Sequence, residues 1–99
     1  MYLIREVLYC EPGQVRELVD KFKALSDIAE RHGYDRFRLC TDVSGERFWT
    51  LVVESEVGSL DAFRELEESV MADPDAGAAM AGYHALVREG RREIYSVEG

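Results

Sequence analysis

The sequence predicts an α+β fold of the ferredoxin-like type, in which the elements follow the order β-α-β-β-α-β and the strands form a four-stranded antiparallel sheet. Two observations carry this prediction. Apolar, strand-like runs alternate with longer segments whose apolar residues recur at helical spacing, and turn residues stand between them at Glu11-Pro12-Gly13 and Ser44-Gly45. The expected strands span 2–10, 34–41, 48–57 and 91–97, and the expected helices span 14–31 and 59–89.

Length and charge limit the class of protein. The chain has 99 residues, so we expect a single domain over 1–99. The net charge of −8 argues against a nucleic acid or an anionic membrane as partner, because both require a basic patch. No stretch approaches the roughly 18 apolar residues of a membrane span, and Arg5 and Glu6 inside the first apolar run argue against a signal peptide. We therefore expect a cytoplasmic protein.

The two cysteines, Cys10 and Cys40, are expected on the first and second strands. A ferredoxin-like sheet has the spatial order 4-1-3-2, so these strands are not neighbours, and a disulfide would exceed the ~7 Å limit between Cα atoms. Both are therefore expected to be buried or half-buried free thiols in a reducing cytoplasm. The chain has no CxxC, HxxxH or HExxH motif, so no metal site is predicted.

The first helix is predicted by an apolar stripe with spacings of three and four: Val15, Leu18, Val19, Phe22, Leu25, Ile28 and Ala29. Gly33 suits the position just past its end, because glycine adopts the left-handed conformation without steric cost. His32 in the last turn favours the helix dipole when it is charged, which is a structural role.

The second helical stretch is expected to begin after an N-cap at Ser59 and to break at Asp73-Pro74. There Asp73 can cap a new helix over 74–89, with Pro74 at its first position, and Gly90 ends it. Each glycine inside a helix costs about 0.8–1 kcal/mol relative to alanine. Either close packing of this helix on the sheet or room for a ligand between helix and sheet would offset that cost. The small residues concerned are Ala76, Gly77, Ala78, Ala79, Ala81 and Gly82.

The third strand predicts a homodimer. Residues 48–53 are apolar on both faces of the strand, which indicates a strand covered on both sides. Two helices cover only one face of a four-stranded sheet, so the other face, roughly 400 Å² in plan, needs a different cover. A second copy of the chain is the simplest cover, with Leu51 or Val52 facing it.

Charged residues interrupt the strands. Arg36 and Arg38 alternate with apolar residues in the second strand, so the open sheet face is expected to be partly charged. Glu54 and Glu56 of the third strand could pair with these arginines. Glu6 in the first strand could serve as a base, or it could pair with an arginine of a neighbouring strand.

His84 is the candidate catalytic residue, because a histidine near neutral pH can act as acid or base. Tyr83, Trp49 and Tyr9, with Met80, are candidate substrate-binding residues beside the segment of small residues. Aromatic side chains with one polar tip suit a flat organic substrate. The alternatives are a rim histidine bonded to backbone or water, and aromatics in the core or a dimer interface.

Four segments resemble dimeric α/β-barrel proteins, and within them the NIPSNAP-like and antibiotic-biosynthesis-monooxygenase-like small proteins: Pro-Gly at 12–13, the strand 48–53, Ser-Leu-Asp-Ala-Phe at 59–63 and Gly-Arg-Arg-Glu-Ile-Tyr at 90–95. The resemblance covers nearly the whole chain. It implies two ferredoxin-like subunits whose sheets face each other to close a barrel. It also implies a cofactor-free, monooxygenase-like enzyme that abstracts a proton from a flat, mostly apolar substrate held between helices and sheet, before reaction with oxygen.

Two alternatives stay open. One is a non-catalytic ligand-binding or stress-associated dimer, and the other is haem binding through His84. The resemblance to the haem-degrading branch implies an Asn in the first strand, a Trp in the second helix and a His near the end of that helix. This chain has Glu6 and Leu66 at the first two positions, and only His84 agrees. No cofactor is therefore expected.

Overall fold

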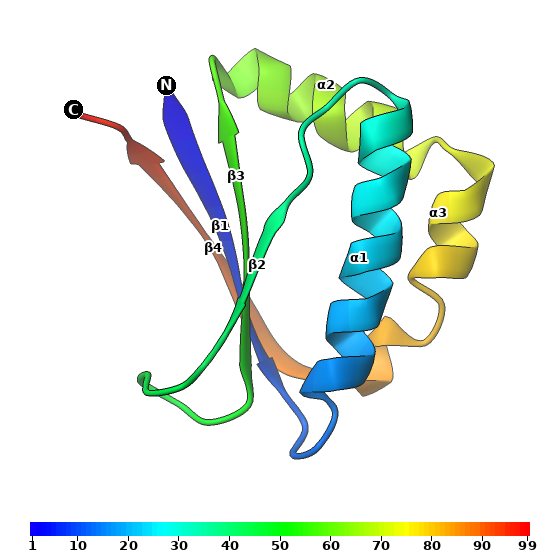
Figure 1. Cartoon of the computed structure of the whole chain (residues 1–99), viewed down its shortest axis with the longest axis vertical. Coiled ribbons are helices and arrows are strands. Elements are labelled where there is room, and N and C mark those ends of the chain that lie inside the picture. The colour runs from blue at the N-terminus through cyan, green and yellow to red at the C-terminus, as the bar shows by residue number, and fades with distance from the viewer.

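The computed structural model describes all 99 residues and confirms the ferredoxin-like order. All strand pairs are antiparallel, and the sheet has the order β2-β3-β1-β4. The three α-helices lie on the same side of the sheet, which leaves its other face, here called the open face, without a helix (Figure 1). The elements are β1 (Tyr2–Cys10), α1 (Val15–Arg31), β2 (Arg38–Thr41), β3 (Thr50–Val57), α2 (Leu60–Met71), α3 (Pro74–Ala79), the 3₁₀ helix η1 (Tyr83–Ala85) and β4 (Val87–Ser96).

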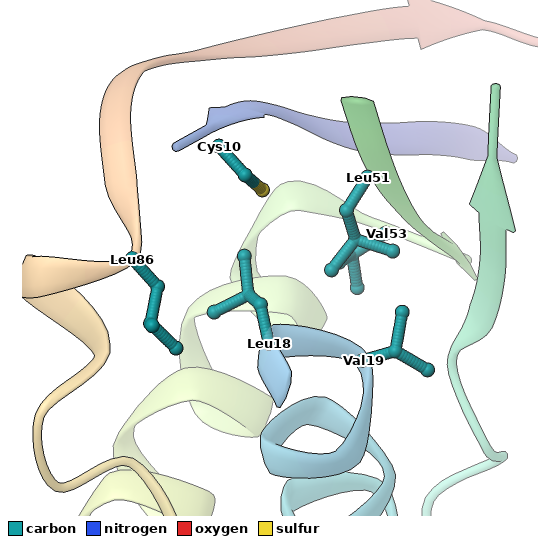
Figure 2. Close-up of a cluster of buried hydrophobic side chains, with 6 residues drawn as sticks. All are labelled: Cys10, Leu18, Val19, Leu51, Val53 and Leu86. Carbon is teal, nitrogen blue, oxygen red and sulfur yellow. The ribbon is translucent and has the colours of Figure 1, made fainter. Parts of the chain in front are cut away.

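The core lies between the sheet and α1. Leu18 and Val19 of α1 point towards Leu51 and Val53 of β3, with Cys10 of β1 beside them (Figure 2). A second buried cluster joins α1 to α2 and α3 through Leu25, Ile28, Ala29, Leu66, Val70 and Ala76. None of the helices is both long enough and apolar enough to cross a membrane.

The end of α1 and the starts of α2 and α3 follow the sequence predictions. Gly33 has a φ of +86° and its N–H bonds to the carbonyl of Glu30, while Tyr34 N–H bonds to Ala29, so α1 ends in a Schellman motif. Ser59 accepts a hydrogen bond from the N–H of Ala62 at 3.0 Å and caps α2. Asp73 caps α3 in the same way, with Pro74 at the first helical position.

The second strand is shorter than predicted, because the segment before it is held by α1 rather than by the sheet. The N–H of Phe37 donates to the hydroxyl of Ser26 at 2.8 Å, and the Arg36 side chain pairs with Asp27 and Glu30. The predicted strand 34–41 therefore pairs with β3 only from Arg38 onwards.

The third strand begins two residues later than predicted. Trp49 has a φ of +62°, a left-handed conformation that a bulky side chain adopts only under local constraint. Backbone and side-chain bonds supply the constraint, since the N–H of Cys10 bonds to the carbonyl of Trp49 and that of Thr50 to the Asp42 carboxylate. Phe48 is consequently outside the sheet and 84% exposed.

The predicted helix over 74–89 is wrong. α3 ends at Ala79, Gly82 has a φ of +81°, and β4 begins at Val87, opposite Cys10 of β1. Because β1 is nine residues long, β4 extends back along it, and this pairing competes successfully with a helix that would contain two glycines. α3 packs against α1 and α2 rather than on the sheet, and a side chain at Gly77 would meet open space.

Gly90, predicted as a helix end, lies inside β4 opposite Leu8. A Cβ atom at this position would lie 2.9 Å from Leu8 Cδ2, so glycine allows the leucine side chain to cross the strand.

Candidate functional site

A mostly apolar cavity of about 280 Å³ lies between the sheet and the helices, here called the helix–sheet cavity. Its volume is near the lower end of ligand pockets, which run from about 300 to 1,000 Å³. Its walls come from β1, β3 and β4 on one side and from α1, α2 and η1 on the other. The lining residues are Ile4, Glu6, Leu8, Phe22, Leu25, Phe37, Val53, Ser55, Phe63, Leu66, Glu67, Val70, Met71, Met80, Tyr83 and Arg92.

Three charged residues of this lining are joined in one ion-pair group, here called the Glu6–Arg92–Glu67 triad. Glu6 of β1 and Arg92 of β4 are paired in register, and Arg92 Nε donates to Glu6 Oε1. Arg92 Nη2 donates to Glu67 Oε2 of α2 at 2.9 Å. The Arg92 guanidinium also lies 4.9 Å from the centre of the Phe63 ring. One arginine therefore stands between two carboxylates at the edge of an apolar space.

The electrostatics of Arg92 favour its charged form. Partial burial acts to lower its pKa, but the hydrogen bonds to Glu6 and Glu67 outweigh burial and raise the pKa of Arg92. The pairing of Glu6 with an arginine of a neighbouring strand, one of the two predicted roles, is confirmed.

The structure brings two of the predicted site residues to this cavity. Tyr83 of η1 and Met80 both line it. His84 is exposed and does not line it, although its ring lies beside that of Tyr83, with 4.0 Å between ring centres. Haem binding through His84 stays a prediction. The catalytic role of His84 stays a prediction.

Trp49 and Tyr9 lie elsewhere. Tyr9 is on the open face, because side chains alternate along β1 and Glu6 and Leu8 occupy the helix side. The Arg47 guanidinium lies 4.2 Å from the centre of the Tyr9 ring. The Tyr9 hydroxyl donates a hydrogen bond to Glu46 at 3.2 Å and accepts one from Arg91. Trp49 is 44% exposed and shares a recess of about 570 Å³ with Tyr9 at the strand ends.

The open face carries a row of ion pairs across all four strands, which we call the open-face row: Arg38 of β2, Glu54 of β3, Arg5 of β1, Glu93 and Arg91 of β4. The predicted pair Arg38–Glu54 is confirmed at 2.7 Å. The predicted partner role of Arg36 is wrong, because Arg36 pairs with Asp27 and Glu30 of α1 instead.

The row lowers the pKa values of its carboxylates. The hydrogen bond from Arg38, opposed by partial burial and helped by Arg5, lowers the pKa of Glu54. The bond from Arg91 lowers the pKa of Glu93. Both carboxylates are therefore charged at neutral pH and bound by arginines on two sides.

The cysteines are free, as predicted. Cys10 is buried on the helix side of β1, and burial together with the nearby charge of Asp42 raises the pKa of its thiol. The predicted burial is wrong for Cys40, which is exposed on the open face of β2, opposite Val52, because no helix covers that face. No group of three or more His, Cys, Asp or Glu side chains has the geometry of a metal site.

The sequence analysis did not predict the Glu6–Arg92–Glu67 triad. It predicted that Glu6 could pair with an arginine of a neighbouring strand, but it named neither Arg92 nor Glu67 as a partner. The pairing of Glu6 with Arg92 depends on the register between β1 and β4, because a one-residue shift would place Arg92 on the other face of the sheet. The link to Glu67 depends on the rotation of α2, which no short sequence pattern specifies.

No family model matches this sequence, and no curated protein matches it either. Solved structures with the same fold include an uncharacterized NIPSNAP domain protein from Burkholderia xenovorans, with a TM-score of 0.82 and 17% identity over 99% of this chain and 95% of that chain. A NIPSNAP family protein of unknown function from Agrobacterium tumefaciens has a TM-score of 0.80 and 16% identity, over 96% of this chain and 86% of its own.

A structure described as an antibiotic biosynthesis monooxygenase has a TM-score of 0.71 and 11% identity, and all of both chains is covered. At such identities the likeness shows a shared fold and carries no residue or activity across. The ferredoxin-like fold of the single chain, which the sequence resemblance implied, is confirmed by these structures.

Proposed function

We propose that this chain is a small-molecule enzyme of monooxygenase-like type, which binds a flat, mostly apolar organic substrate in the helix–sheet cavity. The observation that carries the proposal is that cavity, an apolar space whose few polar groups converge at one edge. The fold shared with an antibiotic biosynthesis monooxygenase supports the choice of reaction type. Tyr83 and Met80 would contact the substrate, and His84 is retained as the acid–base candidate because its ring lies against Tyr83.

The reaction would need no cofactor. A base removes a proton from an acidic methylene group of the substrate, and the resulting carbanion transfers electrons to molecular oxygen. The methylene becomes a carbonyl, one oxygen atom stays on the carbon, and the other leaves as water with the two hydrogens. The substrate itself is the reductant, so the atoms and electrons balance without a further reagent.

Oxygen uptake with anthrone, a flat neutral molecule with an acidic methylene, tests the proposal. We expect uptake roughly 10²-fold faster than in buffer, the contribution of a positioned acid or base. Met80→Trp should abolish the acceleration by filling the cavity, while Leu60→Trp at an exposed position of α2 should leave it unchanged. Binding without uptake would favour a non-catalytic ligand-binding protein, and an unchanged rate in His84→Ala would remove His84 from the mechanism.

We also propose that a second copy of the chain covers the open face. Val52 and Leu3 are partly exposed there and Tyr95 is 49% exposed. In the open-face row the charges alternate from Arg38 to Glu93, so a two-fold axis parallel to the strands sets arginines of one copy against glutamates of the other.

Sedimentation velocity tests the dimer. The structure selects Val52 for the test, because Leu51 is fully buried on the helix side. Val52→Asp should sediment as a monomer, and Leu60→Asp, which adds the same charge on the helix layer, should sediment as the unchanged protein does. Equal sedimentation of Val52→Asp and the unchanged protein would overturn the dimer.

A further inference from the structure

The charges that line the helix–sheet cavity do not cancel. Glu6 and Glu67 are carboxylates, and Arg92 is the single cation of the lining, so the triad has one negative charge in excess. The chain as a whole has a net charge of −8, which adds a field of the same sign. A ligand that enters this cavity therefore meets a negative potential at its polar end.

The triad has free hydrogen-bond acceptors, and its one cation is already paired with two carboxylates. Arg92 binds Oε1 of Glu6 and Oε2 of Glu67, and the second oxygen of each carboxylate has no donor from the protein. A carboxylate oxygen only accepts hydrogen bonds. The Arg92 guanidinium already pairs with both carboxylates and faces the Phe63 ring, so its single positive charge is outweighed by the two negative charges beside it.

The remaining walls suit a ring system. Phe22, Phe37, Phe63 and Tyr83 line the same space as the triad, and its volume of about 280 Å³ limits the ligand to a small body. Aromatic faces also attract cations, so they do not oppose a positive group near the triad.

We propose that the ligand of the helix–sheet cavity is an organic cation: a protonated amine on a flat apolar body of one or two rings. The ammonium group donates hydrogen bonds to the free oxygens of Glu6 and Glu67 and neutralises the excess charge, while the rings lie against the phenylalanines. This inference rests on the proposed function, because it names the class of molecule that the same cavity takes.

Three naphthalene probes of one shape and different charge test the inference: 2-naphthylmethylamine, 2-naphthalenemethanol and 2-naphthoate. Their fluorescence anisotropy reports binding to the full chain at pH 7. We expect the amine to bind roughly tenfold tighter than the alcohol, which corresponds to one partly solvated ion pair. The carboxylate should bind weakest of the three.

Two variants locate the preference. Glu6→Gln keeps the shape of the side chain and removes the excess charge, so the amine should bind no tighter than the alcohol. Glu56→Gln removes the same charge from an exposed position of β3 without an ion pair, and the preference for the amine should persist. Circular dichroism of both variants verifies the fold.

The outcomes separate this inference from the proposed function. If none of the probes binds, the cavity is not a ligand site and the proposed function fails. If the probes bind and the alcohol or the carboxylate equals the amine, the cavity binds ligands but the cation assignment is overturned. A preference for the amine that survives in Glu6→Gln also overturns it, because the charge then lies elsewhere.

Discussion

The two faces of the sheet arrange their charges in opposite ways. On the helix face one arginine, Arg92, stands between two carboxylates. On the open face each carboxylate stands between two arginines, as Glu54 does between Arg38 and Arg5. The same strands thus present free carboxylate oxygens to an apolar cavity on one side and a line of arginines on the other.

This difference shows what each face can hold. The helix face has a mostly apolar cavity beside its charges, and such a cavity favours a small molecule. The open face has its apolar residues largely covered within one chain, since Val7 is 4% exposed and Tyr9 is 6% exposed. The open face is partly charged, as the sequence predicts, and the stems of its charged side chains cover much of its apolar surface.

The largest expected effect is on stability, and it separates the faces. Leu51 is fully buried on the helix side and Val52 is its partly exposed neighbour on the open face. Leu51→Ala should lower the free energy of unfolding by about 3 kcal/mol, because it leaves a cavity in the core. Val52→Ala should lower it by about 1 kcal/mol. Urea denaturation of both variants measures the difference.

If the chain dimerises, the free energies of unfolding of these variants depend on protein concentration. Repeating the urea titration of Val52→Ala over a hundredfold range of protein concentration shows whether association contributes to the loss. Equal losses for the two variants, at a concentration where both are monomers, would contradict the assignment of the helix face as the core.

Much of the fold follows from local sequence signals. The Schellman ending at Gly33 and the caps at Ser59 and Asp73 each depend on one residue type at one position, and each was predicted. The segment 74–89 was not, because its glycines and alanines specify no element strongly. There the pairing of β4 with the full length of β1, a contact between the ends of the chain, decides the outcome.

The site was less predictable than the fold. The sequence places four candidate residues beside the segment of small residues, and two of them, Tyr83 and Met80, line the cavity. Tyr9 and Trp49 do not line it, since Tyr9 points to the open face by strand alternation and Trp49 precedes β3 in a left-handed conformation. Assigning all of the aromatics to one pocket ignored which face of the strand each occupies.

The two cysteines lie on opposite faces of the sheet, so their reactivity compares the exposure of the two faces. Cys10 is buried on the helix side with a raised thiol pKa, and Cys40 is exposed on the open face. Iodoacetamide at pH 8 should modify Cys40 roughly 100-fold faster than Cys10, because Cys10 reacts only after local opening. Mass spectrometry of the peptides measures both rates.

The same reaction rates also test whether a second copy of the chain covers the open face. If the open face is covered in the dimer, Cys40 should react faster in Val52→Asp than in the unchanged protein, and Cys10 should not change. A Cys10 that reacts as fast as Cys40 in the folded protein would contradict the burial of the helix side.

The smallest expected effect concerns the open-face row and its pH dependence. Glu54→Gln should lower the free energy of unfolding by about 1 kcal/mol at pH 7, because a partly buried carboxylate loses its charge-assisted bonds to Arg38 and Arg5. The matched variant Glu56→Gln, on the same strand but without an ion pair, should stay within about 0.5 kcal/mol of the unchanged protein.

The sign of the pH effect follows from the pKa of Glu54, which Arg38 and Arg5 lower from 4.5 in the folded chain. The stabilisation is complete above the unfolded value and is lost as the pH falls through the lowered folded value. The difference between the unchanged protein and Glu54→Gln should therefore be constant from pH 8 to about 5.5 and shrink at more acidic pH. A difference that grows on acidification would show that Glu54 is destabilised by its burial rather than stabilised by the arginines.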